Sequence, residues 1–524
     1  MKKRFTKFLS ILLLISLCYP VSEMSAYAAK TSHKAKQVKS GVAKSTKSHH
    51  DHEHEELFRK AYIQKGDVLS VTDCVSIAFN NSPVIRRYKY QLDVAKSNVG
   101  IAKSEYFPVI GAGVGFTNIN NQNHVDYDRH YREFPSVAVT INKLVWDFGK
   151  TTSLIKMEEF YKIGAEYEFV DSLCETLFNV KEKYYALLFA KSKLAVEKKD
   201  YELNEELLDL AEKIAAKDPS RRADVSSARL NLGVARVRYH QAVNDYKNAK
   251  IDLNNAMWVE QPEEYTIKST DTYSYNNEFI DTTALKEFIP EELPFDMKTA
   301  PEIAYKNSPD LKVLIATFKA MEQSLNYIKR TYFPELKANA GYGFNNTNRE
   351  KSNNSWVVGV SMESSVNLMN LRHSIKGADA QLNIADNEIV LFKKNLYYKV
   401  NRALNNLTKA ELEFPITQVS AANAYNHLQI VMDDYEHQKE NYVAMQTART
   451  NYHAALIAYI EALYAYNTAL INVERATHSH LIDIHHKGEH AVHYHSNELV
   501  EHVTKWLNCD EKEKRKRIRK EYQL

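Results

Sequence analysis

The sequence predicts a mixed α and β membrane protein in which one structural unit occurs twice. Three observations support this fold class: a duplicated pair of triplet motifs, strand patterns of transmembrane length, and heptad repeats in long stretches that are poor in proline. A unit that returns once, at a long separation, is typical of two halves of one protomer rather than of a solenoid of short repeats.

The duplicated motifs delimit the same stretch in each half. The first copy runs from Asn81-Ser82-Pro83 to Tyr106-Phe107-Pro108, and the second from Asn307-Ser308-Pro309 to Tyr332-Phe333-Pro334. The spacing between the two triplets is the same in both copies, with no gap. Each stretch has apolar residues at three- and four-residue steps, which predicts a helix before each Tyr-Phe-Pro.

A β-hairpin is expected after each Tyr-Phe-Pro triplet. The first strands begin at Val109 and Glu335, and their partners run over Ser136–Val145 and Trp356–Val366. In all four, apolar residues alternate with small or polar ones, so one face is apolar. Strands of about ten residues with this pattern suit a transmembrane β-barrel. A pair of soluble hairpins with one buried face is the alternative.

In a barrel, the apolar strand faces meet lipid. Val114 and Val358 then face lipid, while Gly113 and Ser361 face the lumen. Backbone groups at an open sheet edge stay unpaired in lipid, and four strands cannot close a barrel. A barrel built from this chain therefore requires several copies.

Long helices follow each hairpin. The expected helices cover 70–105, 150–216 and 225–253 in the first half, and 297–332, 372–438 and 445–476 in the second. The returning helix of each half has an unbroken heptad seam, which predicts coiled-coil packing. The long helix of the first half would extend about 100 Å. Ser70 or Thr72 is the expected N-cap of the first helix, and Pro415 should kink the long helix of the second half.

The ends of the chain differ from the repeats. Met1-Lys2-Lys3-Arg4, the apolar stretch Phe8–Leu17 and Ala26-Tyr27-Ala28 have the order of a cleavable export signal. Lipidation at Cys18 is an alternative, but Leu17 fits the required sequence poorly. The expected segments are a signal peptide (1–28), a disordered His/Lys-rich segment (29–66), the first repeat (67–257), a connecting segment (258–296), the second repeat (297–477) and a His-rich, basic tail (478–524).

Composition excludes several classes of protein. The formal net charge is only +3 over 524 residues, which gives no case for nucleic-acid binding. No other stretch approaches the apolar length of a membrane-spanning helix.

Cys74, Cys174 and Cys509 remain after cleavage, and an odd number cannot pair fully within one chain. The first two fall in helical patterns, where a buried thiol is expected. No phosphate-binding loop, nucleophile elbow or paired carboxylate motif indicates an enzyme, and no cofactor is expected.

Taken together, the export signal, the two repeats and their motifs resemble the TolC family of outer-membrane efflux and secretion channels. Leu144-Val145-Trp146-Asp147-Phe148-Gly149-Lys150 closely matches the strand-to-helix junction of that family, and the resemblance covers about residues 68–477. It implies a homotrimer in which four strands per protomer form a 12-stranded β-barrel, continued by a long periplasmic α-helical barrel. It also implies passive transport in the outer membrane of a Gram-negative cell, with a periplasmic adaptor and an inner-membrane pump as partners.

The resemblance also places candidate site residues at the periplasmic tip. Adaptor docking is expected at the two turns between paired helices, at Asp218, Pro219, Ser220, Arg221, Lys439 and Glu440. Asp224 matches the position of an acidic constriction, whereas the second repeat has Ala444 and Thr447 there. Pairing of Asp224 with Arg221 or Arg222 is the alternative. Unlike the family pattern, neither tip has a glycine, and the second junction, Asn367–Arg372, lacks one too.

Histidine is concentrated in the two tails, which contain 13 of the 20 histidines. Neutral imidazole binds zinc and copper, although the spacings define no tetrahedral set. The candidate metal ligands are His49, His50, His52, His54, His485, His486, His490, His493 and His495. Hydrophilic tails without metal are the alternative.

Two other functions remain open at the level of sequence. One is a periplasmic adaptor with a coiled-coil hairpin, which would need neither two repeats nor alternating apolar strands. The other is an outer-membrane channel of a metal-efflux system whose histidine-rich tails bind its cargo.

Overall fold

The computed structural model describes residues 63–119, 132–260, 262, 264–268, 293, 297–348, 351–437 and 439–479. These residues belong to one of two compact units of the chain. The expected signal peptide, most of the His/Lys-rich segment, Cys509, and the tail from residue 480 lie outside the described residues.

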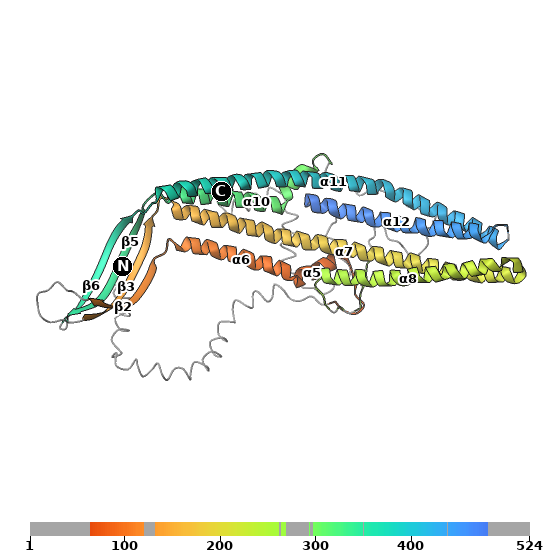
Figure 1. Ribbon diagram of the computed structural model, residues 1–524, viewed down its shortest axis with the longest axis horizontal. Helices are drawn as coiled ribbons and strands as arrows, with labels where there is room; N and C mark the ends of the chain where they lie inside the picture. The colour runs from red at the N-terminus through yellow and green to blue at the C-terminus, as the bar shows by residue number, and fades with distance from the viewer. Residues whose placement is uncertain are drawn as a thin grey trace, which may run out of the picture. The chain divides into compact units, whose positions relative to one another are not determined.

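Both halves follow the expected order of elements (Figure 1). The first contains α5 (Val71–Asn81), α6 (Pro83–Ser104), β2 (Val109–Ile119), β3 (Arg132–Trp146), α7 (Lys150–Lys217), the short 3-10 helix η3 (Pro219–Arg221) and α8 (Arg222–Ala256). The second contains α9 (Ala300–Asn307), α10 (Pro309–Arg330), β5 (Glu335–Asn348), β6 (Lys351–Glu363), α11 (Leu368–Glu436) and α12 (Tyr442–Thr477). Two short strands, β1 (Val68–Leu69) and β4 (Thr266–Ile267), pair in parallel.

The expectation of one helix before each hairpin is wrong, because the Asn-Ser-Pro motif divides it in two. The side chains of Ser82 and Ser308, both fully buried, cap α6 and α10 by accepting hydrogen bonds from the backbone N–H groups of Ile85 and Leu311. The proline that follows each serine begins the new helix, where no N–H partner is needed. Ser70 caps α5 as expected, in a reciprocal capping box with Asp73.

The four long strands form one antiparallel sheet in the order β2-β3-β5-β6. Its register aligns the apolar positions across the sheet. Ile110 lies opposite Ile141, which lies opposite Ala340, and Ala340 lies opposite Val358. Ile110 and Val358 are each 71% exposed, so no described residue of the protomer covers this apolar face. The expected division of faces is therefore present.

The opposite face of the sheet is packed from small residues. Gly111 lies opposite Thr140, and a Cβ atom at Gly111 would come within 2.8 Å of the Thr140 hydroxyl oxygen. A Cβ at Gly359 would come within 3.0 Å of Asn339 Oδ1. Glycine keeps this face flat and lets polar side chains of neighbouring strands cover the backbone.

The long helices pack as two antiparallel pairs, α7 with α8 and α11 with α12, and α7 also contacts α12. The expected heptad seams lie at these contacts. Ala228, Ala235 and Ala242 of α8 are buried, as are Tyr452, Tyr459 and Tyr466 of α12. Cys74 and Cys174 are buried free thiols, as expected. The helix α11 continues through Pro415, so this proline does not end it, and the expected kink stays a prediction.

One expectation about membrane-spanning helices needs correction. By length and composition, α12 is a helix that could cross a membrane, although half of its most apolar window is buried. It packs on α11, α7 and α9, and its apolar residues, such as Tyr466 and Val473, are those of the heptad seam. Burial against three helices identifies it as a core helix of the helical region.

The junction between β3 and α7 explains the motif around Asp147. The Asp147 carboxylate accepts hydrogen bonds from the N–H groups of Gly149 and Thr151, so it caps α7. Phe148 and Gly149 have φ angles of 55° and 82°, a left-handed turn that favours glycine. The Arg330 guanidinium donates to the Gly149 carbonyl at 2.6 Å.

The second junction needs no glycine because it turns differently. Asn367 has a φ of −89°, and its side-chain oxygen accepts hydrogen bonds from the N–H groups of Met369 and Asn370. The missing glycine therefore reflects an ordinary N-cap and not a defect in the repeat.

We expect Gly149→Ala to lower the free energy of unfolding by about 1–3 kcal/mol, the typical cost of a non-glycine residue in the left-handed region. The added Cβ would also lie 2.8 Å from Arg330 Nη1. Gly100→Ala is the matched control, because this glycine lies within α6 with nothing within 4 Å of its Cβ position. It should leave stability unchanged or raise it by about 0.5–1 kcal/mol. Denaturant titration followed by circular dichroism measures both, and equal effects would contradict the role of the junction.

Candidate functional site

The first tip is a capped turn between α7 and α8. Asp218 Oδ1 accepts hydrogen bonds from the N–H and the hydroxyl of Ser220, at 3.0 and 2.7 Å. This Asx cap lets Pro219 begin η3. The hydrogen bonds from Ser220 keep the Asp218 pKa below its usual range. The turn thus holds its shape without the glycine that the family pattern has there.

The second tip lies beside the first within one protomer. Asn441 caps α12 by accepting a hydrogen bond from the Ala444 N–H at 2.8 Å, while Lys439 pairs with Asp434 at 3.3 Å. Arg221 Nη1 reaches the Glu440 carbonyl oxygen at 3.5 Å. Beneath the tips, side chains of all four helices form one apolar cluster: Leu207, Ala211, Ile214, Ala228, Tyr435, Tyr442 and Met445.

Asp224 lies in the first turn of α8, close to this cluster. Arg221 Nη1 is 3.7 Å from Asp224 Oδ2, and both side chains are about one-quarter exposed or less. Burial, and then the Asp224 charge, raise the pKa of the Tyr435 hydroxyl to about 12. In the protomer, Asp224 therefore has the ion-pair partner that the sequence offered as the alternative to an open acidic ring.

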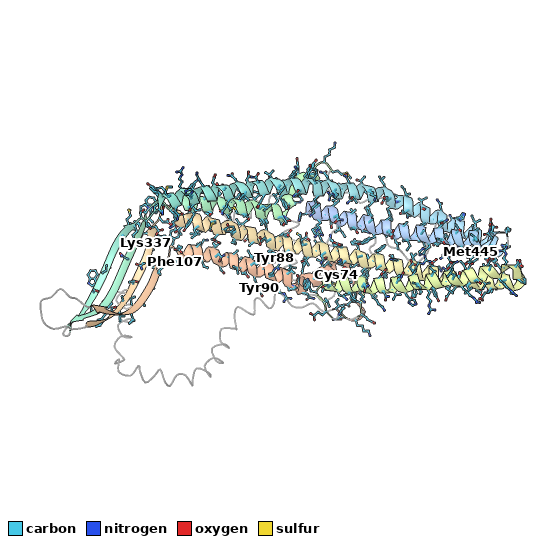
Figure 2. The ribbon with its side chains drawn as sticks, in the orientation of Figure 1. Cys74, Tyr88, Tyr90, Phe107, Lys337 and Met445 are labelled. Carbon is cyan, nitrogen blue, oxygen red and sulfur yellow. The ribbon has the colours of Figure 1, made fainter. Side chains whose placement is uncertain are left out.

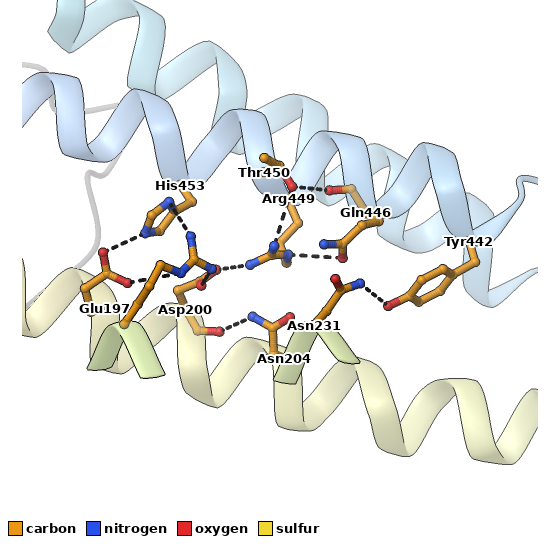
Figure 3. A network of polar contacts seen from close by, with 10 residues as sticks. Glu197, Asp200, Asn204, Asn231, Tyr442, Gln446, Arg449, Thr450 and His453 are labelled. Carbon is orange, nitrogen blue, oxygen red and sulfur yellow. Dashed lines mark hydrogen bonds and ion pairs between the residues drawn. The ribbon is translucent and has the colours of Figure 1, made fainter. Parts of the chain in front are cut away.

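A buried polar network lies farther from the tips, where α7, α8 and α12 meet (Figure 3). Arg449 and Arg238 both donate to Asp200, the second at 2.8 Å. His453 Nε2 lies 3.1 Å from Glu197 Oε1, and Arg238 Nη1 lies 3.4 Å from His453 Nδ1. Glu197, Asp200 and Arg449 are 6% exposed or less. Buried charged side chains thus join the three helices.

The network contains residue types that can bind a metal ion, but its carboxylates are already paired with guanidinium groups. Ligand atoms of Glu197, Asp200 and His453 all lie within 4.8 Å of one another. Two guanidinium groups, however, neutralise the two carboxylates. Burial alone would raise the Glu197 pKa, but hydrogen bonding to His453 and the charges of His453, Arg238 and Lys193 hold it below its usual range. The arrangement is that of a clamp between helices.

Sequence reasoning missed this network. The available signal was spacing, because Glu197 and Asp200 lie three residues apart, and Arg449 and His453 four apart, within heptad-patterned helices. Charged residues at such positions are ordinarily read as a solvated face. Only the packing of α7 on α12 shows that they face each other.

A second buried ion pair joins α7 and α12. Lys181 Nζ lies 2.7 Å from Glu474 Oε2, and the two side chains are 1% and 0% exposed.

A cavity of about 620 Å³ lies among α6, α7, α10 and α11 and is lined in part by Glu168, Asp171 and Asp310. Burial, with the nearby Asp310 and Glu175 charges, raises the Asp171 pKa to about 7.

The candidate metal ligands of the two tails, from His49 to His54 and from His485 to His495, lie outside the described residues. The six expected docking residues and Asp224 all lie at the two tips, as the order of helices predicts.

Removal of one partner should show that the network is a clamp. We expect Arg449→Leu to lower the free energy of unfolding by about 3–5 kcal/mol, because it leaves the buried Asp200 charge short of a partner. The matched control is Arg229→Leu, whose guanidinium pairs with Glu212 at 2.9 Å while 67% exposed. That change should cost less than about 1 kcal/mol. Denaturant titrations of both variants make the comparison, and a small loss for Arg449→Leu would rule out the clamp.

Comparison with known proteins places this geometry in a family. The model of the outer membrane efflux protein family matches residues 74–257 and 300–477. No curated protein sequence matches the chain. Several solved structures share its fold at low sequence identity. The outer-membrane channel OprN has a TM-score of 0.66 and 15% identity, with 81% of this chain and 95% of that chain covered.

Two further channels are similar to the same extent. The CmeC outer membrane channel of Campylobacter jejuni has a TM-score of 0.66 and 14% identity, covering 81% of this chain and 91% of that one. The MtrE outer membrane channel of Neisseria gonorrhoeae, solved in an open state, has a TM-score of 0.64 and 14% identity, covering 78% and 88%. The expected fold class is confirmed: a membrane protein with a β-barrel that continues as an α-helical barrel, built from two repeats per chain. Because the family model matches well over half of its length, the chain belongs to the outer membrane efflux protein family.

Proposed function

We propose that three copies of this chain form the outer-membrane channel of a tripartite efflux or type I secretion system. Family membership confirms the general function, an outer-membrane efflux channel. The proposal adds passive conduction, a periplasmic extension in a Gram-negative cell, export by a cleaved signal peptide, and an adaptor and pump that supply substrate and energy. No catalytic step is required of the chain.

The observation that carries the proposal is the position of the unpartnered apolar surfaces. One lies on the sheet, where Val114 is 73% and Trp356 76% exposed on the same face. A protein in water rarely leaves such a face open, whereas a lipid-facing barrel wall requires it. The periplasmic adaptor alternative has no use for this surface.

The other unpartnered surfaces lie on the two outer helices of the tunnel region. On α8, Leu230, Val237 and Ile251 are exposed at multiples of seven residues. On α11, Leu391, Leu412 and Val419 are exposed at the same period. Both stripes lie opposite the buried seam of their helix, which is the arrangement of a single-layered wall with one neighbour on each side.

The inner helices lack such stripes. Among the described side chains, α7 exposes one large hydrophobic residue, Tyr161, and α12 also one, Val443. Since α7 and α12 contact each other, α8 and α11 are the edges of the four-helix set. We propose that α11 of one protomer packs on α8 of the next, so that three protomers close a ring.

The proposed adaptor contact uses the exposed tips. Pro219, Ser220, Lys439 and Glu440 are exposed, while Asp218 and Arg221 hold the turns that present them. The mixed charge of this surface suits a polar, reversible contact with a partner protein.

Closure of the ring predicts the effect of a charge on the α8 stripe. We expect the purified protein to be a trimer in detergent and Val237→Glu to shift it towards monomer, because a carboxylate buried at an interface loses its hydration. Arg236→Glu, one residue away but off the stripe, should remain trimeric. Light scattering with detergent correction measures the mass. A wild-type protein that is monomeric and folded without detergent would refute the proposed function.

A second prediction concerns the tunnel entrance. If three copies of Asp224 narrow the pore, Asp224→Ala should raise single-channel conductance or lower the preference for cations, because a carboxylate ring concentrates cations. Asp209→Ala, an exposed change on α7 about two turns from the same tip, is the control. Unchanged conductance and selectivity would leave Asp224 with the Arg221 ion pair alone.

The histidine-rich tails form a separate proposal, metal binding at His49–His54 and His485–His495. We expect the mature protein to bind Zn²⁺ or Cu²⁺ with loss of binding when both histidine sets are changed to alanine, since imidazole supplies the ligands. Isothermal titration compares the two proteins. Equal heats would remove metal efflux as the transport role.

A further inference from the structure

A cluster of four charged side chains lies where the sheet meets the helices. We call Lys150, Glu335, Lys337 and Glu363 the junction charge cluster. Lys150 begins α7, Glu335 begins β5, and Glu363 ends β6. Figure 2 labels Lys337 at the end of the sheet that meets the helices. Because these residues begin or end their elements, the cluster lies at the end of the sheet that is joined to the helices.

The register puts three of these residues on the face that is not apolar. Lys337 lies opposite Ser361 on one side and Leu144 on the other, and Glu335 lies opposite Glu363. Leu336, between the two charged residues of β5, belongs to the apolar face. In a barrel whose apolar face meets lipid, Glu335, Lys337 and Glu363 therefore face the lumen.

The charges of the cluster compensate one another. Lys150 Nζ lies 2.6 Å from Glu335 Oε1, and Lys337 Nζ lies 2.9 Å from Glu335 Oε2 and 3.6 Å from Glu363 Oε2. Two cations thus hold two anions. Like charges directly opposite each other in a sheet are destabilising, as is a cation at a helix N-terminus. The ion pairs of Lys337 offset the repulsion between Glu335 and Glu363. The ion pair with Glu335 offsets the unfavourable position of Lys150 at the start of α7.

Within the strand segments whose side chains are described, the cluster contains all the charged residues of this face. In the strand segments with described side chains, 109–115, 136–144, 335–344 and 354–363, the other positions on this face are Gly, Ala, Ser, Thr, Asn, Val or Leu. The Glu363 side chain is 66% exposed and that of Lys337 is 39% exposed. Both can therefore act on a solute that passes through the lumen.

We infer that the junction charge cluster sets the charge selectivity of the pore at the base of the barrel lumen, and we call this level of the pore the filter. The inference rests on the proposed trimeric channel, which repeats the cluster three times around the pore. With equal numbers of both signs, this level of the pore admits cationic and anionic solutes alike. Loss of one sign leaves an unpaired ring of the other, and a charged ring in a pore selects ions of opposite sign.

The test is the reversal potential of single channels in planar bilayers under a KCl gradient. Lys337→Met leaves an extra negative charge per protomer and should shift the reversal potential towards that of K⁺. Glu363→Gln leaves an extra positive charge and should shift it towards that of Cl⁻. The double variant should return to the wild-type value.

Lys143→Met is the matched control. Lys143 lies on β3 opposite Ala338, at nearly the same level as Lys337 but on the apolar face. Its loss should leave the reversal potential unchanged. Salt dependence separates electrostatics from a structural change, because the Debye length falls from about 10 Å at 0.1 M to about 3 Å at 1 M. The shifts should therefore shrink in concentrated KCl.

The outcomes distinguish the filter from the channel itself. If wild-type protein forms no pores, the proposed function fails. If wild-type pores form but Lys337→Met and Glu363→Gln shift the potential in the same direction, or neither shifts it, the filter is refuted. Should Lys337→Met fail to fold, Glu363→Gln decides alone, because it removes an exposed carboxylate with one contact at 3.6 Å. A shift with Lys143→Met as large as that of Lys337→Met would likewise refute the assignment.

Discussion

The two unpaired edges of the four-stranded sheet are the constraint on which the rest of the structure depends. Among the described residues, β2 and β6 have one strand neighbour each. In lipid, an open edge would leave a row of backbone donors and acceptors without partners. The apolar face shared by Ile110, Ile141 and Val358 places the sheet in lipid, so this cost cannot be met by water. Each edge therefore needs another strand, which another copy of the chain can provide.

The helices have the same requirement in a different form. A helix in a single-layered wall has neighbours on two opposite sides, and α7 and α12 have both within the protomer. α8 and α11 have one long-helix neighbour each, and their outward sides carry apolar residues at heptad spacing. Open strand edges and open helix edges occur in one chain because the sheet and the helices form one continuous wall. The sheet part of this wall contacts lipid, and the helical part contacts water.

Between the two regions, the chain must pass from a strand to a helix in a fixed direction. At the first junction, Asp147 and Gly149 make the turn, and Arg330 ties it to α10. The junction charge cluster lies beside this turn and links Lys150 of α7 with both strands of the second hairpin. Farther along, the buried pairs of Asp200 with Arg449 and Lys181 with Glu474 join α7 to α12. Buried ion pairs of this kind contribute little net stability but favour one arrangement of helices over others.

The sequence by itself determined the repeat, the strand faces, the heptad seams and the positions of both tips. These features are local and periodic: side chains alternate along a strand and recur every seven residues along a paired helix, whatever their partners are. The sequence did not determine that Asn-Ser-Pro ends one helix and begins another, because a serine and a proline are each compatible with several local structures. It also did not show that Glu197, Asp200, Arg238, Arg449 and His453 form one network. Their meeting depends on how α7, α8 and α12 pack, and residues about 250 positions apart come together only when the tertiary structure brings their helices into contact.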